Sequence, residues 1–177
     1  MTRTDASTGS GHATGILGLG LVTAAAVLAL DQVTKAWALS ALWPPHMPHP
    51  VMPFLNWRLG FNTGATFGMF SGGSASGVWL LVGVAVVITA WLLAWMWRTR
   101  SRLEATSLGL VIGGAVGNVV DRLRRGAVTD FIDAHYAGWH WPTFNVADIG
   151  IVCGVALLLL GSFRPERKAA ATTGADG

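Results

Sequence analysis

The chain has 177 residues, of which 52% are hydrophobic and only 12% are charged. Soluble domains usually carry about 25% charged residues, so this composition excludes an ordinary soluble domain. Together with a mean hydropathy of +0.51, it indicates a membrane protein of one domain. The net charge of +3 does not indicate nucleic-acid binding, because the basic residues are few and lie in short clusters beside apolar runs.

The two ends of the chain differ from its middle. Residues 1–15 are polar and rich in Gly, Ser and Thr, and we expect a cytoplasmic extension there. They are not expected to be part of a cleavable signal peptide, because the apolar run that follows is long enough to stay in the membrane. Residues 164–177 are basic at first and then small and polar, which predicts a disordered cytoplasmic tail. Residues 16–163 are expected to form the membrane domain.

Four apolar runs predict four transmembrane helices, at about residues 16–39, 78–97, 103–120 and 147–163. Each approaches the ~20 residues that a helix needs to cross a ~30 Å hydrocarbon core. Strands of a membrane barrel would alternate with period two, and these runs do not. In the third run, Gly109, Gly113 and Gly117 recur every four residues, which favours close approach of a neighbouring helix.

The segment after the first run predicts a small β element. Residues 43–50 contain four prolines, which prevents a helix there. Residues 54–62 are apolar and aromatic and end in turn residues, as expected of a short strand on the membrane surface. The expected fold class is therefore an all-α membrane protein, with four transmembrane helices and a small extracytoplasmic β element.

Basic residues predict the orientation. They cluster between the second and third runs and again after the fourth, at Arg98, Arg100, Arg102, Arg164, Arg167 and Lys168. The positive-inside rule places these clusters, and both termini, in the cytoplasm. Residues 43–77 and 121–146 then lie outside. The second of these segments contains Arg122, Arg124 and Arg125, which oppose this orientation; we expect Arg124 and Arg125 to contact solvent or lipid headgroups.

Four acids lie near the outer ends of the predicted spans: Asp31, Asp121, Asp130 and Asp148. A carboxylate in the membrane is costly, so such residues suggest a function. Taken singly, Asp148 could be a first-turn helix acid and Asp130 a solvated loop acid, as we expect for Asp133. As a pair, Asp130 and Asp148 could share a proton and hydrolyse a peptide bond. Asn145 precedes Asp148 by three residues and would share its helix face.

Other hydrolytic mechanisms lack their parts. The sequence has no His-Glu-x-x-His motif and no Gly-x-Ser-x-Gly elbow. The histidines at positions 46, 49, 135 and 140 lack metal-ligand spacing, so no metal site is expected. Cys153 lies within the fourth apolar run, where we expect it to be buried and unreactive. A Ser–Lys dyad would need Lys35 or Lys168. Lys35 lies at the end of the first apolar run and Lys168 in the C-terminal tail, so this mechanism is not expected.

Five motifs in a fixed order resemble the lipoprotein signal peptidase family, also called signal peptidase II. They are Asp31-Gln-Val-Thr-Lys35, Asn62-Thr-Gly-Ala-Thr-Phe-Gly68, Gly117-Asn-Val-Val-Asp121-Arg122, Gly126-Ala-Val-Thr-Asp130-Phe131 and Phe144-Asn-Val-Ala-Asp148. The resemblance covers roughly residues 19–160. One departure is Thr66, where the family more often has Ala.

The resemblance implies an intramembrane aspartic endopeptidase of the bacterial inner membrane, with its active site near the outer face. Its substrate would be a prolipoprotein whose Cys carries diacylglycerol, cut just before that Cys, with no cofactor and with sensitivity to globomycin. Asp130 and Asp148 match the catalytic dyad. The residues that match site-shaping positions are Asn62, Gly64, Asn118, Arg122 and Asn145, and those that match structural polar positions are Asp31, Lys35 and Asp121. A monomer in contact with membrane lipid is expected.

Two other classes of protein stay open on the residues alone. A small four-span transporter or proton relay could also place acids at one membrane face, although it should carry acids deeper in the spans or broken helices at the midplane. A membrane scaffold without activity would leave the clustered Asn and Asp residues unexplained.

Overall fold

A computed structural model of the chain describes residues 8–64 and 75–163. Its elements, in chain order, are α1 (Thr8–Ala41), β1 (His49–Met52), β2 (Leu55–Asn62), α2 (Ala75–Arg98), α3 (Arg102–Arg125), β3 (Val128–Tyr136), β4 (Trp139–His140) and α4 (Val146–Ser162). The rest of the chain lies outside the described residues. It comprises residues 1–7 of the expected N-terminal extension, residues 65–74 with Thr66 and Gly68 of the second motif, and the expected C-terminal tail.

Three of the helices are long and apolar enough to cross a membrane, at Thr14–Ala41, Gly77–Arg98 and Arg102–Arg125. The fourth apolar run forms a shorter helix, α4, of 17 residues, which is the lower limit for a span. The predominantly helical fold is therefore confirmed, and a crossing by α4 stays a prediction. The first and third helices are longer than the predicted apolar runs, since they also include polar residues at their ends.

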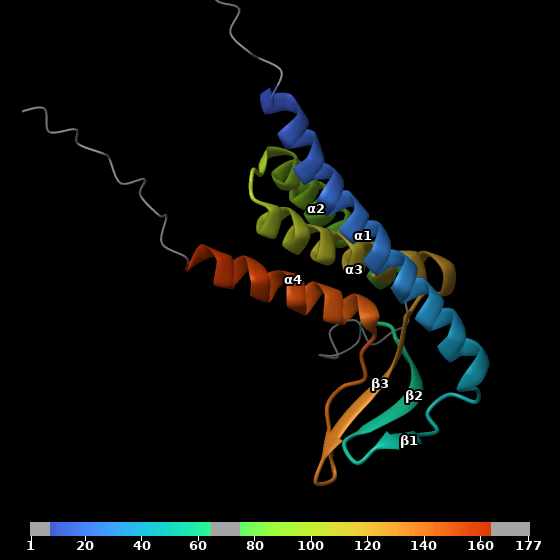
Figure 1. Cartoon of the computed structure of the whole chain (residues 1–177). Helices are drawn as coiled ribbons and strands as arrows, with labels where there is room; N and C mark the ends of the chain where they lie inside the picture. Colours follow the sequence, from blue (N-terminus) through green and yellow to red (C-terminus); the bar gives the residue numbers. More distant parts are fainter. Residues whose placement is uncertain (1–7, 65–74, 164–177) are drawn as a thin grey trace, which may run out of the picture.

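Helix α3 is the central helix of the bundle and packs against α1, α2 and α4 (Figure 1). Its glycines explain how closely α1 can approach. A Cβ atom added at Gly113 would lie 2.5 Å from the carbonyl oxygen of Ala24, and one at Gly109 would collide with the carbonyl of Gly20. No side chain fits at either position, so the predicted packing role of these glycines is confirmed.

A four-stranded antiparallel sheet, with strand order β1-β2-β3-β4, projects beyond the ends of the helices where α1 and α3 finish and α4 starts (Figure 1). The predicted β element corresponds to β2. Strand β3 was not predicted: residues 128–136 were expected to be an outer loop. Its partner, β2, lies more than sixty residues earlier in the chain, so no local pattern indicates the pairing.

The sheet is fixed to the helices by a small hydrophobic core. Leu59, Phe131 and Ile132 from the strands pack against Ala38 and Leu42 at the end of α1. Leu59 is fully buried. This core explains why the sheet has a set position relative to the helix ends, and the site described next lies along that junction.

Candidate active site

Asp130 lies on the buried part of β3, where only 2% of it is exposed. Its register partner is Gly60 on β2. Asp130 is therefore a strand residue at the junction of sheet and helices, and the expectation that it could be a solvated loop acid is wrong.

Asp148 lies in the first turn of α4. Asn145 is the N-cap residue of this helix, and the two residues form a reciprocal capping box. The backbone N–H of Asp148 donates to Oδ1 of Asn145, and the backbone N–H of Asn145 donates to Oδ2 of Asp148, both at 3.1 Å. Asn145 has an extended backbone, so the expectation that it would share a helical face with Asp148 is wrong. The capping box, rather than a shared helical face, holds the side chains of Asn145 and Asp148 together at the start of α4.

Two amide side chains connect the carboxylates. Asn145 Nδ2 donates to Oδ1 of Asp130 over 2.7 Å, and Asn118 Nδ2, from α3, donates to Oδ1 of Asp148 over 2.9 Å. The two amides also contact each other, with Asn145 Nδ2 3.4 Å from Asn118 Oδ1. Asp130, Asp148, Asn118 and Asn145, which come from three separate elements, therefore form one hydrogen-bonded cluster.

The surroundings of Asp130 change its acidity. Burial, together with the negative charge of Asp148, raises the pKa of Asp130 from 3.8 to about 6, against the opposite effect of hydrogen bonds from Asn145 and Asn62 and of the Lys35 charge. A buried carboxyl beside a second carboxylate holds its proton more tightly. Asp130 is therefore suited to carry a proton near neutral pH.

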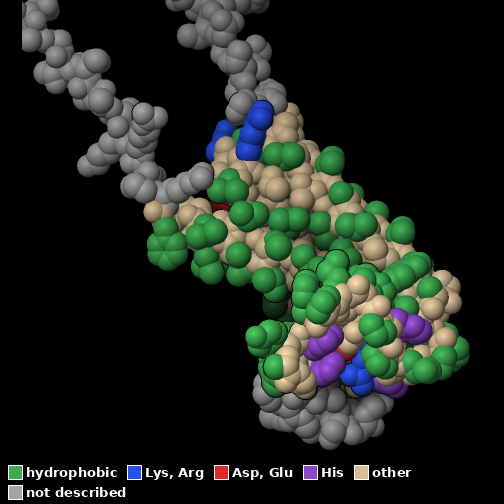
Figure 2. Space-filling model, turned by 60° about the horizontal axis from the view of Figure 1, so that its bottom comes forward, with side chains coloured by type: hydrophobic (Ala, Val, Ile, Leu, Met, Phe, Trp, Pro, Cys, Tyr) green, Lys and Arg blue, Asp and Glu red, His purple; other side chains and the backbone are tan. Residues whose placement is uncertain are grey.

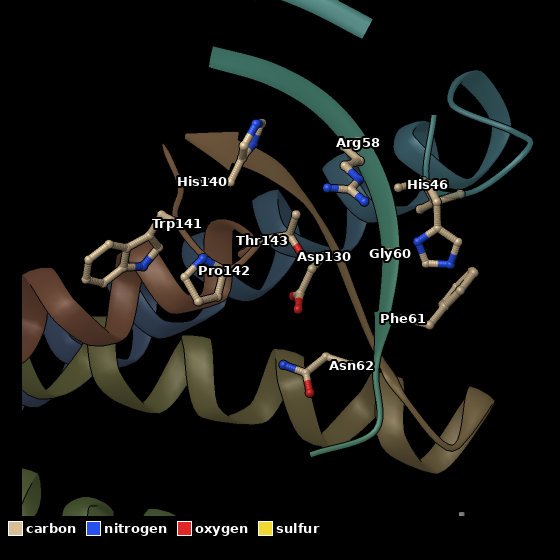
Figure 3. Close-up of a pocket in the computed structure, with 11 residues that line it drawn as sticks. His46, Arg58, Gly60, Phe61, Asn62, Asp130, His140, Trp141, Pro142 and Thr143 are labelled. Carbon is tan, nitrogen blue, oxygen red and sulfur yellow. The ribbon is translucent and has the colours of Figure 1, made fainter. Parts of the chain in front are cut away.

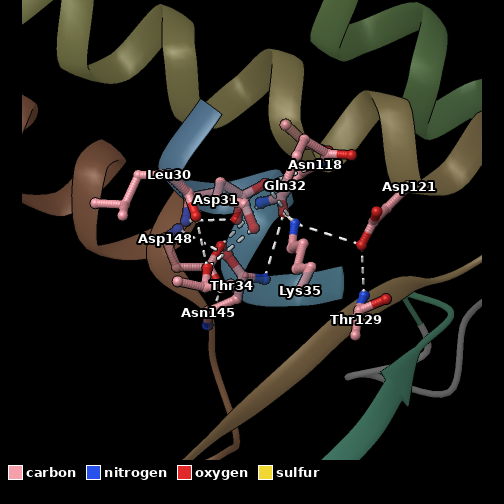
Figure 4. Close-up of polar contacts among 12 residues, drawn as sticks. Leu30, Asp31, Gln32, Thr34, Lys35, Asn118, Asp121, Thr129, Asn145 and Asp148 are labelled. Carbon is pink, nitrogen blue, oxygen red and sulfur yellow. Dashed lines mark hydrogen bonds and ion pairs between the residues drawn. The ribbon is translucent and has the colours of Figure 1, made fainter. Parts of the chain in front are cut away.

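A second polar group supports the cluster from the helices (Figure 4). The Lys35 ammonium, 1% exposed, lies 2.9 Å from Asp31 Oδ2 and 3.4 Å from Asp121 Oδ2. It also donates to Oδ1 of Asn118 over 3.0 Å. The other oxygen of Asp31 accepts the backbone N–H of Ala147, directly before Asp148. Lys35 thus orients Asn118, and Asp31 fixes the first turn of α4.

Asp121 joins the end of α3 to the sheet. Its Oδ2 accepts the backbone N–H of Thr129 over 2.8 Å, which sets the position of β3 directly before Asp130. Its Oδ1 pairs with Arg125 at 2.9 Å. Arg124 and Arg125 are both exposed, as expected, but the ion pair of Arg125 with Asp121 was not predicted.

Arg122 and Asn62 face the same cluster. Arg122 is half-buried, and its guanidinium interacts electrostatically with Asp130, Asp148 and Asp121. Its Nε atom has no hydrogen-bond partner within the described residues. Asn62, at the end of β2, hydrogen-bonds Asp130 and accepts the N–H of Gly64 over 2.8 Å. Gly64 has a φ of 84°, a conformation that favours glycine.

Two cavities open on the carboxylates. One of about 430 Å³ lies over β2, and Asp130, Asn62, Gly60 and Trp141 are among its lining residues (Figure 3). The other, of about 360 Å³, runs along α4 and is lined mainly by apolar side chains together with Asp148. Trp141 lines both cavities. Sequence reasoning missed Trp141; the only signal was a pair of tryptophans beside Pro142 in a polar loop.

Two further expectations need correction. Asp133 is fully buried; its carboxylate accepts a hydrogen bond from Asn56 and lies 2.7 Å from His140 Nδ1. Although burial acts to raise the pKa of Asp133, these hydrogen bonds and the charges of His140 and Arg58 lower it below its ordinary value. Cys153 is exposed on α4 and is not buried against another part of the protein that the structure describes.

Within the parts of the chain that the structure describes, no group of three or more His, Cys, Asp or Glu side chains could hold a metal ion. Asp130 and Asp148 each accept a side-chain hydrogen bond from an asparagine. The arrangement presents two acids from different elements at the mouths of two cavities, one polar and one apolar.

Residues 23–164 match the protein family described as Signal peptidase (SPase) II. The lipoprotein signal peptidase of Methylobacterium sp. (strain 4-46) is 50% identical over 160 residues, which are 90% of this chain and 97% of that protein. The protein of the same name from Polynucleobacter necessarius subsp. necessarius (strain STIR1) is 43% identical over 145 residues, 81% of this chain and 88% of the relative. A solved bacterial membrane enzyme has a TM-score of 0.75 and 29% identity, covering 83% of this chain and 94% of that one.

Proposed function

The chain belongs to the signal peptidase II family, and we propose that it removes the signal peptide from diacylglyceryl-modified prolipoproteins with Asp130 and Asp148 as an aspartic dyad. It is a peptidase that acts on prolipoproteins, so the transporter and scaffold interpretations are set aside. The observation that carries the dyad is the amide bridge, in which Asn145 hydrogen-bonds Asp130 and caps the helix turn of Asp148.

In the proposed reaction, one carboxyl group is protonated and the other ionised. Asp130 has the raised pKa, so we assign it the proton, which it donates to the oxygen of the scissile carbonyl. Asp148, whose two oxygens accept amide hydrogen bonds, takes a proton from the attacking water. The amine of the lipidated Cys then leaves after it accepts a proton from the dyad. The guanidinium of Arg122 stabilises the negative charge that develops nearby.

The apolar cavity beside Asp148 suits the lipid of the substrate. Phe144, Ile149 and Val152 line it, and the outer surface of α4 continues with exposed Val155, Leu159 and Leu160. Acyl chains lying along this surface would bury apolar area without leaving the bilayer. This arrangement would hold the lipidated Cys at the dyad, at the depth where the membrane ends.

We further propose that all four helices cross the bacterial inner membrane, with both termini in the cytoplasm and the sheet outside. This orientation is supported by the basic residues at the α2–α3 turn and by the position of the sheet at the opposite end of the helices. Labelling of single cysteines with a membrane-impermeant maleimide tests it in a Cys153→Ser background. Gly138→Cys should react in intact spheroplasts and Arg100→Cys, at an exposed position of the α2–α3 turn, only after lysis; the reverse pattern would contradict the orientation.

The activity itself is tested with the purified protein and a recombinant diacylated prolipoprotein. We expect a shorter product on a gel, a new N-terminal lipidated Cys by mass spectrometry, inhibition by globomycin and full activity in the presence of strong chelators. The same prolipoprotein without diacylglycerol should be cut far more slowly. Because every residue of the cluster comes from one chain, we expect the monomer to be active. Loss of cleavage on chelation, restored by zinc, would refute the aspartic mechanism.

A further inference from the structure

The cavity beside Asp130 continues outward across the sheet. A neighbouring cavity of about 590 Å³ is lined by residues of all four strands, and both cavities share His46, Arg58 and His140. Together they form one trough, which we call the outer trough, running from Asp130 toward the far end of the sheet. Figure 2 shows histidine and basic side chains gathered on this part of the molecule.

Arg58 is the fixed positive charge of the outer trough. Arg58 is half-buried, yet among the residues from 8 to 64 and from 75 to 163 its side chain has no hydrogen bond or ion pair. The charge of Arg58 acts on Asp133, but the two carboxylate oxygens of Asp133 already bind Asn56 and His140. The donors of Arg58 therefore remain available to a ligand.

A β-bulge places Arg58 in the trough. Trp57 pairs with Ile132 and Gly60 pairs with Asp130, so Arg58 and Leu59 together lie opposite the single residue Phe131. Leu59 is fully buried in the core, and Arg58 is left facing outward. Bulges beside active sites commonly redirect a side chain in this way. Figure 3 shows the Arg58 guanidinium and the Asp130 carboxylate on the same side of β2, with Phe61 on the other side.

The position of the trough identifies the part of the substrate that lies in it. If acyl chains follow α4 in the bilayer, the polypeptide after the lipidated Cys must leave toward water, which is the side of the sheet. Arg58 lies two residues along β2 from Gly60, the partner of Asp130, or about 7 Å in an extended chain. That distance corresponds to roughly two substrate residues beyond the scissile bond, before allowing for the length of the Arg58 side chain.

We propose that Arg58 binds the carboxylate of an acidic residue located two to four positions into the mature lipoprotein, counting the lipidated Cys as the first. The outer trough is then a specificity subsite that favours Asp or Glu there. A guanidinium binds a carboxylate with two parallel hydrogen bonds, which a neutral side chain cannot match. This inference rests on the proposed function, since it concerns the same substrate.

The test compares diacylated substrates that differ only by Asp, Asn or Lys at the second, third or fourth mature residue. With the wild-type enzyme, kcat/KM for the Asp substrate should exceed that for Asn by up to about fivefold at one of these positions, the range for a partly exposed charged pair, and Lys should be poorest. The Asp preference should weaken in high salt. Arg58→Gln should remove the preference, and Arg58→Glu should make Lys better than Asp.

Arg124→Glu is the matched control, because Arg124 is an exposed arginine outside the trough, and it should keep the wild-type ratios. Each ratio compares substrates of one enzyme variant, so a partial loss of folded enzyme does not alter it. The ratios of the wild-type enzyme test the subsite even if an Arg58 variant fails to fold. Equal kcat/KM for Asp, Asn and Lys at all three positions, or an unchanged Asp preference in Arg58→Glu, would overturn the subsite. Failure of wild-type enzyme to cleave any diacylated substrate would instead contradict the proposed function.

Discussion

The side-chain amide of Asn145 donates a 2.7 Å hydrogen bond to Oδ1 of Asp130, which joins the start of α4 to the first part of β3. The same residue caps the helix that carries Asp148. One side chain thus sets both the position of one carboxyl group and the local structure that presents the other. A rigid link of this kind is what a proton-sharing pair requires, because small displacements change both acidities.

The dyad predicts that Asp130→Asn and Asp148→Asn each abolish cleavage while the protein remains folded and inserted. Asn keeps the size of Asp but can neither accept the water proton nor hold the shared one. The double variant should be little worse than either single variant, because the two groups act as one unit. Turnover of a diacylated prolipoprotein by purified enzyme measures this.

Asp133→Asn on the same strand is the matched control for the dyad variants. It weakens the pairing with His140, so we expect a lower melting temperature with cleavage retained. Near-normal turnover by either dyad variant, or complete loss of turnover in folded Asp133→Asn, would contradict the assignment.

Asn145→Ser separates the two roles of Asn145. Serine is a good helix cap, so the melting temperature should stay close to that of the wild type, but serine is too short to reach Asp130. We expect kcat to fall at least tenfold with a smaller change in KM. Asn145→Ala should lose the cap as well, at about 1 kcal/mol of stability. Equal kcat for Asn145→Ser and wild type would show that the contact with Asp130 does not matter.

The raised pKa of Asp130, about 6, predicts an alkaline limb in kcat/KM as the shared proton is lost. Asn145→Ser should shift this limb to higher pH, because the hydrogen bond it removes lowers the pKa of Asp130. A pH profile of the residual activity measures the shift. A limb that does not move, or that moves to lower pH, would contradict the proposed role of Asp130.

The same pKa predicts an effect on stability. Folding raises the pKa of Asp130 above its ordinary value of 3.8, so ionisation is less favourable in the folded state. Relative to the ionised form, protonated Asp130 favours the folded state. This contribution to stability is fully present below about pH 4 and is lost as the pH rises through about 6. Asp130→Asn should therefore melt at a higher temperature than the wild type at pH 7.5. The difference should disappear near pH 4, and a constant difference across this range would contradict the linkage.

Arg122→Lys should impair cleavage more than Arg124→Lys. The planar guanidinium of Arg122 interacts with both dyad carboxylates, and a lysine cannot reproduce its two-pronged geometry. Arg125 is unsuitable as the control because it pairs with Asp121. Measured kcat/KM values that are equal for the two lysine variants would show that Arg122 has no special role.

Lys35→Met should destabilise the protein by about 3–5 kcal/mol, because it leaves the buried carboxylate of Asp31 without its ion pair. The triple contact of Lys35 with Asp31, Asp121 and Asn118 also predicts lost activity, through a misplaced Asn118. Asp31→Asn combined with Lys35→Met removes both charges and should recover part of the melting temperature. No recovery would show that the pair contributes mainly through packing.

The sequence alone determined the membrane class, the apolar helices and the order of the five motifs, because apolar length and short-range spacing are local properties of the chain. It also placed Asp31 and Lys35 one helical turn apart. Only the tertiary structure decided how these parts meet. The pairing of β2 with β3 over a long sequence separation made Asp130 a buried strand residue rather than a loop acid, and the cap of α4 directed Asn145 toward it. The buried state of Asp133, the pairing of Arg125 and the bulge that exposes Arg58 follow from the same non-local contacts, for which a single sequence carries no periodic signal.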